Sequence, residues 1–213
     1  MSWKEIGKAI NDTLIKGRLK PLNRIIEDEA YDTFFNTAIA LETENATNIL
    51  LVTHGTVSIA DSEFEGFTQK TVIFPNTLKS IGSLAFRGAE LRSVVIPPSV
   101  THLGDGAFME CANLIHVILP KYVEKIDDDT FENTAIESVT IPKYVKQIGR
   151  LAFGYNSNLR CVVFKGKPDS IADNAFANDT LLSDIYVPWN EGEVANAPWG
   201  APNGVQIHYG YEV

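Results

Sequence analysis

The chain has 213 residues, and 45 % of them are hydrophobic, so it can bury the core of one or two domains. Its formal net charge of −9 at pH 7 disfavours nucleic acid as a partner, because an acidic surface repels the phosphate backbone. No run of about 18 apolar residues occurs, so the sequence predicts no membrane span. Two cysteines, Cys111 and Cys161, are too few for a disulfide framework, and both are predicted to be buried free thiols.

The first 44 residues predict a pair of α-helices that form a separate N-terminal segment. Ser2 and Glu5 have the spacing of a capping box, and Gly17 can end the first helix. Pro21 suits the first turn of a second helix, which we expect to end near Leu41. The first helix alternates charged and apolar residues, so it lacks the unbroken apolar stretch of a signal peptide.

Two roles are open for these predicted helices, because each carries an apolar face that must be covered. They can seal the first repeat unit as a cap, or they can dock the chain into a larger assembly. The residues expected to make the attachment in the second case are Trp3, Ile6, Ile10, Phe34 and Phe35.

From residue 45 to residue 213 the chain repeats one short unit, which we call a rung. Its most regular feature is an aromatic residue that recurs at intervals of 22 or 23 residues: Phe64, Phe86, Phe108, Phe131, Phe153, Phe176 and Trp199. We call these the anchor residues. A fixed period of this length predicts a solenoid of about seven rungs, because so short a unit can bury its apolar side chains only by stacking on its neighbours.

The residues of one rung predict three short elements. Val94 and Ile96 are separated by one residue, and this period of two predicts a strand with one face inward. Pro97 ends the strand, because proline has no amide hydrogen to donate to a further ladder bond. A second extended segment follows, and Gly104 allows a tight turn. Residues 104–108 are then predicted to form one helical turn that carries Phe108 into the core.

The segment LRSVVIPPSVTHLGDGAF, residues 91–108, closely resembles the BspA-type leucine-rich repeat, and the pattern recurs at 114–131, 136–153 and 159–176. The resemblance covers about residues 48–207 and implies a leucine-rich-repeat solenoid with a parallel sheet along one side. It also implies a binding module of the kind found in bacterial surface and adhesive proteins and in phage-encoded proteins, with no catalytic motif. The N-terminal stretch KEIGKAIN, residues 4–11, resembles the start of phage structural proteins.

One column of the repeat lies between the inward strand residues and should face solvent, yet it is mostly apolar. We call it the outer stripe; it consists of Leu51, Ile73, Val95, Ile118, Thr140, Val163 and Tyr186. Strand propensity explains the column in one interpretation, since β-branched residues also suit exposed strands. In the other, a partner covers the stripe, since contiguous exposed apolar patches are typical of interfaces.

Residues for catalysis or metal binding do not converge in the sequence. The four histidines occupy different positions of the repeat, namely His54, His102, His116 and His208. Stacking of rungs therefore does not bring them together, and no metal site is expected. The sequence also contains no phosphate-binding loop or nucleophile–base motif. We therefore expect neither an enzyme nor a cofactor.

These observations predict a non-enzymatic binding or structural module. The first hypothesis is a phage virion component in the tail, the baseplate or a fibre, with the helices docked in the particle and the solenoid facing the host or another subunit. The alternative is a bacterial surface adhesin or an intracellular scaffold of the same repeat family. The expected partners are other protein subunits, or a protein or glycan of a host surface.

Overall fold

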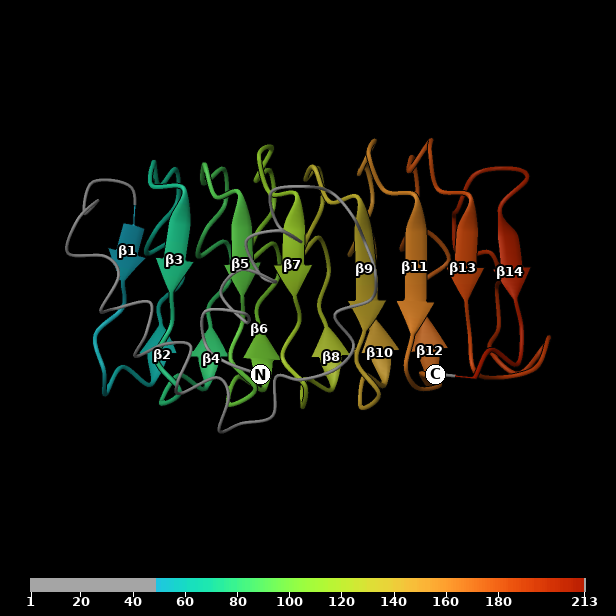
Figure 1. The fold of residues 1–213 in the computed structure, drawn as a ribbon, viewed down its shortest axis with the longest axis horizontal. Helices are drawn as coiled ribbons and strands as arrows, with labels where there is room; N and C mark the ends of the chain where they lie inside the picture. Colours follow the sequence, from blue (N-terminus) through green and yellow to red (C-terminus); the bar gives the residue numbers. More distant parts are fainter. Residues whose placement is uncertain (1–48, 213) are drawn as a thin grey trace, which may run out of the picture.

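The computed structural model describes residues 49–212 as a stack of rungs (Figure 1). The two predicted helices, the five predicted attachment residues and the predicted boundary between residues 44 and 45 all lie outside the described residues. Among residues 49–212 every regular element is a β-strand, and each paired strand is parallel to its neighbour. The predicted solenoid is therefore confirmed for the repeat region.

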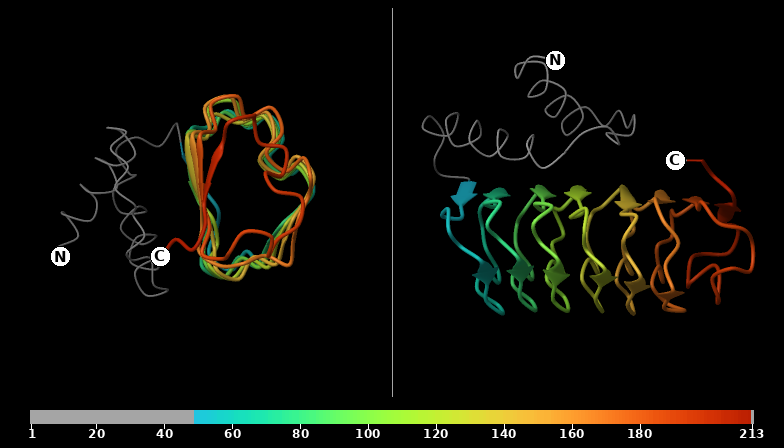
Figure 2. Two further views of the ribbon diagram at one scale, coloured as in Figure 1. Left: turned by 90° about the vertical axis from the view of Figure 1, so that its right-hand side faces the viewer. Right: turned by 90° about the horizontal axis from the view of Figure 1, so that it is seen from below.

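Two series of strands alternate along the chain and lie on two sides of the solenoid (Figure 2). The long-strand face consists of β1 (Ile49–Leu51), β3 (Thr71–Ile73), β5 (Ser93–Val95), β7 (His116–Ile118), β9 (Ser138–Ile141), β11 (Cys161–Phe164), β13 (Asp184–Tyr186) and β14 (Gln206–His208). The short-strand face consists of β2 (Ser58–Ile59), β4 (Ser80–Ile81), β6 (His102–Leu103), β8 (Lys125–Ile126), β10 (Gln147–Ile148) and β12 (Ser170–Ile171). Equivalent residues of successive rungs are partners, such as Leu50 with Val72 and Ile81 with Leu103.

The anchor phenylalanines form a continuous row in the core. Successive ring centroids lie 5.2, 5.3, 5.4, 5.5 and 5.7 Å apart from Phe64 to Phe176, and the planes differ by no more than 17°. Phe86, Phe108, Phe131 and Phe153 have no solvent-exposed surface. Each buried ring contributes about 1.5–3 kcal/mol before the cost of ordering it, so the row is a main source of stability. Trp199 is also buried but leaves the row, because it packs against Phe164 and Trp189.

The predicted helical turn at each anchor residue is wrong, because the described residues contain no helix. In the Phe86 rung, Leu84 and Gly88 have positive φ values of 56° and 66°. Three amides of this turn donate to the next rung: Leu84 N to Asp105 O at 2.9 Å, Phe86 N to Ala107 O at 2.8 Å and Gly88 N to Met109 O at 2.8 Å. A helix would direct these amides along its own axis, whereas the left-handed residues turn every second amide toward the neighbouring rung. The anchor turns thus form a third line of hydrogen bonds between rungs.

A left-handed backbone conformation at a bulky residue destabilises the fold locally, and substitution by glycine removes this destabilisation. Tyr155 has a φ of 61°, and its side chain is exposed. The left-handed conformation costs an L-residue about 1–2 kcal/mol, while glycine loses about 0.5–1 kcal/mol of extra backbone entropy on folding. Tyr155→Gly is therefore expected to raise the free energy of unfolding by roughly 0.5–1 kcal/mol in urea denaturation. Tyr155→Ala keeps the strained φ and serves as the control; a glycine variant no more stable than the alanine variant would contradict this account.

Both faces are interrupted near the middle of the stack. The hydrogen-bonded ladder of the long-strand face stops between β7 and β9, and that of the short-strand face stops between β6 and β8. The second gap coincides with Asp127, which occupies a column of glycine or alanine in the other rungs. At the equivalent Gly104, an added Cβ would lie 2.5 Å from Ser83 N, so this column leaves little room for a side chain. Asp127 is buried and forms an ion pair with the partly exposed Lys125.

Candidate functional site

The seven residues of the outer stripe lie on successive strands of the long-strand face. The strand register pairs Leu51 with Ile73, Val95 with Ile118 and Val163 with Tyr186. Their neighbours along each strand, such as Val94 and Val162, point into the core. The strands therefore show the alternation that the sequence pattern predicted, with the exception of Ile73, which is buried although it belongs to the stripe.

Exposure varies along the outer stripe. Ile118 is 38 % exposed and Leu51 is 40 % exposed, while Ile73 is only 5 % exposed. The other four members are half-buried: Val95, Thr140, Val163 and Tyr186. The stripe is interrupted between Ile118 and Thr140, where the ladder of this face also stops. The most accessible apolar side chains of the stripe are therefore Leu51 at its start and Ile118 beside this interruption.

The stripe ends in an aromatic and polar cluster on β13 and β14, part of which the sequence analysis missed. The rings of Tyr186 and His208 are stacked with centroids 4.3 Å apart, and Tyr211 packs 5.0 Å from Tyr186. His208 Nε2 lies 2.8 Å from Asp184 Oδ1, and Ser183 Oγ donates to Asp184 Oδ2 at 2.7 Å. These contacts, with the hydrogen bond from Ser183 first, lower the pKa of Asp184. The signal for this cluster was the period itself, because His208 follows Tyr186 by 22 residues and is its register partner, but His208 comes after the last anchor residue and was not assigned to the column.

Serine, aspartate and histidine meet here in an order that does not activate a nucleophile. Asp184 lies between Ser183 and His208, so its carboxylate accepts a hydrogen bond from the serine. A catalytic triad instead places the histidine next to the serine. The nearby Cys161 has a raised pKa because it is partly buried and lies opposite Asp184, so its thiol stays protonated at neutral pH.

The second cysteine is a core residue. Cys111 is buried and free, and its Sγ donates to Phe86 O at 3.1 Å. Burial raises the pKa of its thiol to about 12. Both cysteines are thus free, as predicted, although Cys161 is only half-buried.

A buried polar column lies three residues after the anchors and was not recognised in the sequence. Asn156 Oδ1 accepts hydrogen bonds from Thr134 N at 2.6 Å and from Thr134 Oγ1 at 2.7 Å. Asn156 Nδ2 donates to the carbonyl oxygens of Phe131 at 3.0 Å and Phe153 at 2.6 Å. Asn156 N in turn donates to Asp179 Oδ1 at 2.8 Å. These residues are structural, because they satisfy backbone groups that face the core.

Asp179 is the exception in this column. It is completely buried, and its Oδ2 has no hydrogen-bond partner among the described residues. Burial raises the pKa of its carboxyl from 3.8 to about 8, although the bond from Asn156 N acts in the opposite direction. The side chain therefore carries a proton at neutral pH.

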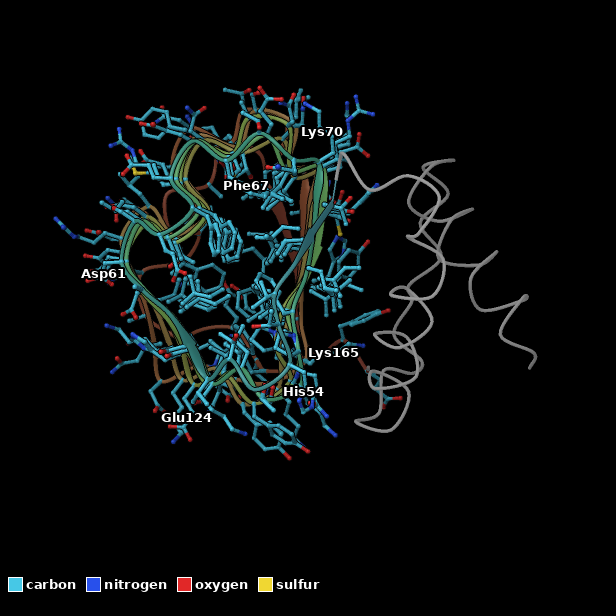
Figure 3. The ribbon with its side chains drawn as sticks, turned by 90° about the vertical axis from the view of Figure 1, so that its left-hand side faces the viewer. His54, Asp61, Phe67, Lys70, Glu124 and Lys165 are labelled. Carbon is cyan, nitrogen blue, oxygen red and sulfur yellow. The ribbon has the colours of Figure 1, made fainter. Side chains whose placement is uncertain are left out.

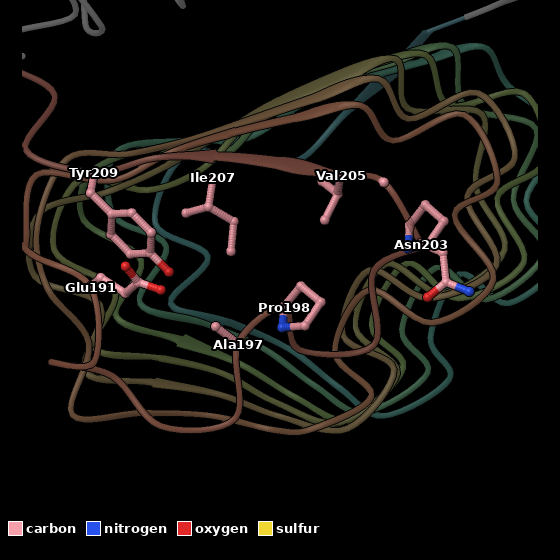
Figure 4. Close-up of a pocket in the computed structure, with 9 residues that line it drawn as sticks. Glu191, Ala197, Pro198, Asn203, Val205, Ile207 and Tyr209 are labelled. Carbon is pink, nitrogen blue, oxygen red and sulfur yellow. The ribbon is translucent and has the colours of Figure 1, made fainter.

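The C-terminal end of the stack contains an open cavity of about 320 Å³ (Figure 4). Glu191, Pro198, Val205, Ile207 and Tyr209 line it, and they project from the last turn of the chain toward the solenoid axis. Trp189 and Trp199 are buried beneath this turn and close the core. The cavity is therefore the inner face of the terminal rung and not an entrance to the interior.

Two further properties concern only residues 49–212. No group of three or more histidine, cysteine, aspartate or glutamate residues in this range could hold a metal ion. This range also contains no helix that is long and apolar enough to cross a membrane.

Comparisons with solved structures find solenoids of low sequence identity. A leucine-rich cell surface protein of Faecalibacterium prausnitzii is 21 % identical with a TM-score of 0.38, and the match covers 78 % of this chain and 60 % of that protein. The pneumococcal vaccine antigen PcpA is 17 % identical with a TM-score of 0.42, over 76 % of this chain and 58 % of the antigen. A leucine-rich repeat protein of T. pallidum is 17 % identical with a TM-score of 0.43, over 73 % and 78 % of the two chains. The chain thus spans less than two thirds of the first two proteins.

No curated protein is significantly similar to the chain. The family described as "BspA type Leucine rich repeat region" matches residues 38–160 and 108–196, with 6 copies of the repeat. These matches cover most of the chain and include every predicted rung except the end of the last. They also agree with the resemblance seen in the repeat columns and with the stacked parallel strands. The chain therefore belongs to the BspA-type leucine-rich repeat family.

Proposed function

We propose that the chain is a non-enzymatic module that binds another protein through the outer stripe, as a surface adhesin or scaffold does. The observation that supports this proposal is the exposed Ile118 beside Val95 on an otherwise regular sheet face. Exposed apolar side chains on paired strands of a rigid sheet favour association with a complementary apolar surface. Membership of a repeat family that presents extended surfaces supports the same function.

The family match favours the bacterial alternative over the virion role that was the first hypothesis from the sequence. That role, in a phage tail, baseplate or fibre, stays a prediction, as does docking through the N-terminal segment. The chemistry of the described residues supports a module without catalysis, because Cys161 is not activated as a nucleophile and Ser183 donates its hydrogen bond to Asp184. The stripe is therefore the surface to test first.

The double substitution Val95→Asp and Ile118→Asp is expected to abolish protein binding and leave the fold intact. Two carboxylates on the exposed side of β5 and β7 would have to be desolvated in any apolar interface, which costs several kcal/mol. Adjacent like charges on paired strands cost the fold only about 0.2–1 kcal/mol. Binding would be measured by biolayer interferometry against a panel of purified surface and matrix proteins, and self-association by analytical ultracentrifugation.

Val57→Asp is the matched control, because Val57 is an exposed apolar residue outside the stripe. It is expected to keep the binding of the wild-type protein. Equal binding by a well-folded double variant, or a wild-type chain that binds no protein and does not self-associate, would show that the proposal is wrong.

A further inference from the structure

The turn that leads into β14 contains the only Asn–Gly pair of the sequence, which is Asn203 followed by Gly204. Val205 N donates to Pro202 O at 3.2 Å, so the pair occupies the two central positions of a four-residue turn. Gly204 has a φ of 96°, which suits the third position of a type II turn. Figure 4 shows Asn203 at the end of the terminal cavity that lies opposite Glu191. The pair therefore lies at the tip of a turn on the terminal rung.

This Asn–Gly pair is accessible to a reaction within the chain. In any Asn–Gly pair the glycine nitrogen can attack the side-chain carbonyl carbon of the asparagine, because glycine has no Cβ to shield the nitrogen. Asn203 and Gly204 are both exposed, and a Cβ added to Gly204 would meet no atom within 4 Å. Among residues 49–212, Gly204 N donates no hydrogen bond. Within this range the nitrogen is therefore neither covered nor held in place.

A turn at the opposite end of the stack has the same geometry, but its glycine nitrogen is hydrogen-bonded. Thr56 N donates to Thr53 O at 3.1 Å, and Gly55 has a φ of 94°, so this turn corresponds closely to the turn before β14. Gly55 N donates to Thr77 Oγ1 at 3.2 Å. Its neighbour His54 lies at a corner of the first rung in Figure 3. The first rung therefore provides a matched turn in which a hydrogen bond holds the glycine nitrogen.

The sequence also contains one Asp–Gly pair, Asp105 and Gly106, and its glycine nitrogen is held too. Asp105 is exposed, but Gly106 is buried in an anchor turn and its nitrogen donates to Asp128 O at 2.9 Å. An exposed side chain before a glycine is thus not enough, because the glycine nitrogen must also be free to turn toward it. Asn203 and Gly204 meet both conditions.

We propose that Asn203 is a site of spontaneous covalent modification by deamidation. Gly204 N attacks Asn203 Cγ, and the new C–N bond closes a succinimide ring. The side-chain nitrogen leaves as ammonia and takes with it the proton of the attacking amide. Water then opens the ring at one of its two carbonyl groups. Opening at Cγ gives aspartate, and opening at the main-chain carbonyl gives isoaspartate, in which the backbone continues through the former side chain.

The modification acts on the turn that positions the last strand. Gln206 N donates to Ser183 O at 2.8 Å directly after this turn, where the pairing of β14 with β13 begins. Both products add a negative charge at the turn, and isoaspartate also lengthens its backbone by one carbon atom. The outer-stripe residues Val95 and Ile118 lie on β5 and β7, several rungs away. The modification and the proposed protein binding are therefore tested separately.

The proposal is tested by incubating the folded chain at pH 8 and 37 °C in water labelled with oxygen-18. Digestion at acidic pH and mass spectrometry of the peptides then locate each lost amide. The peptide that contains Asn203 is expected to lose its amide, to take up one heavy oxygen and to give separate aspartate and isoaspartate products. Asn203→Gln is expected to abolish the reaction, because glutamine would have to form a larger ring. Gly204→Ala is expected to slow it about tenfold or more, because a Cβ shields the nitrogen.

The matched turn of the first rung supplies the control. His54→Asn places an Asn–Gly pair there, and this pair is expected to deamidate roughly two- to tenfold more slowly than Asn203, because Gly55 N is hydrogen-bonded to Thr77. His54→Asn combined with Thr77→Val removes this bond and is expected to raise the rate toward that of Asn203. Circular dichroism would confirm that each variant is folded during the incubation.

Two outcomes would overturn the proposal. One is an intact Asn203 in the folded chain after an incubation that deamidates it in the chain unfolded by urea, since the turn would then protect the amide. The other is an equal or faster rate at position 54 of the His54→Asn variant with Thr77 in place. That result would show that the free glycine nitrogen does not distinguish the turn before β14.

Discussion

Phe108→Ala is expected to lower the free energy of unfolding by about 3–5 kcal/mol. Phe108 has no exposed surface and lies between Phe86 at 5.3 Å and Phe131 at 5.4 Å, nearly parallel to both. Removing the ring leaves a cavity in the middle of a row whose rungs are stabilised mainly by their neighbours. Equilibrium denaturation in guanidinium chloride, followed by circular dichroism, would measure the loss.

Phe64→Ala is the matched control at the end of the row. Phe64 is only half-buried and stacks on one anchor neighbour, Phe86. Its removal is expected to cost less than half as much as the removal of Phe108, because less surface is buried and the site is open enough to relax. Equal losses at the two positions would contradict the view that the continuous row is what stabilises the centre of the stack.

Asp179→Asn is expected to stabilise the protein at neutral and alkaline pH and to remove a pH dependence. The carboxyl has a pKa of about 8 in the fold, compared with 3.8 ordinarily. Below about pH 4 it is neutral in both the folded and the unfolded state, and its contribution to stability is fully present. Between about pH 4 and pH 8 only the unfolded state releases the proton, so stability falls steadily as the pH rises. Above about pH 8 the loss is complete.

An amide at position 179 avoids this loss, because it cannot ionise. Its oxygen can still accept the bond from Asn156 N, which now ends on Asp179 Oδ1 at 2.8 Å. Its nitrogen can donate to nearby carbonyl oxygens, as Asn156 Nδ2 does to Phe131 O and Phe153 O. The difference in unfolding free energy between variant and wild type should therefore grow from near zero at pH 4 to a few kcal/mol at pH 8.

The reciprocal substitution supplies the control. Asn156→Asp places a carboxyl at a position where the amide now donates two hydrogen bonds, so it is expected to destabilise the protein increasingly as the pH rises. Urea denaturation from pH 4 to pH 9 would measure both variants. A wild-type stability that runs parallel to that of Asp179→Asn over this range would show that Asp179 is already ionised in the fold.

Much of the candidate interaction surface could be predicted because strand geometry is local. Residues of a strand alternate between two sides, so Val94 and Val95 had to face opposite ways once Val94 was assigned to the core. The contact between the rings of Tyr122 and Tyr144 could also have been found, since the two residues share a repeat position. It was overlooked because the equivalent positions of the earlier rungs carry other residues, so the column looked irregular.

Other features of the site depended on contacts that no single rung contains. The cluster of Tyr186 and His208 joins β13 to β14, where His208 continues the column 22 residues after Tyr186 and beyond the last anchor residue. The exposure of Ile118 coincides with the interruption between β7 and β9. The exposure of Ile118 does not follow from the period, because it depends on how two particular rungs pack.

The sequence by itself determined the solenoid, its period and its inward columns, because a unit of 22 or 23 residues can bury its phenylalanines only against copies of itself. Only the tertiary structure decided how the anchor turns are built. Residues 104–108 were expected to be helical from their composition, but their amides are better satisfied by the neighbouring rung, as in the bond from Phe108 N to Thr130 O at 2.9 Å. A backbone amide bonds to a carbonyl group that lies within reach. Stacking places carbonyl groups of the next rung beside these amides, so the bonds form between rungs and not along a helix.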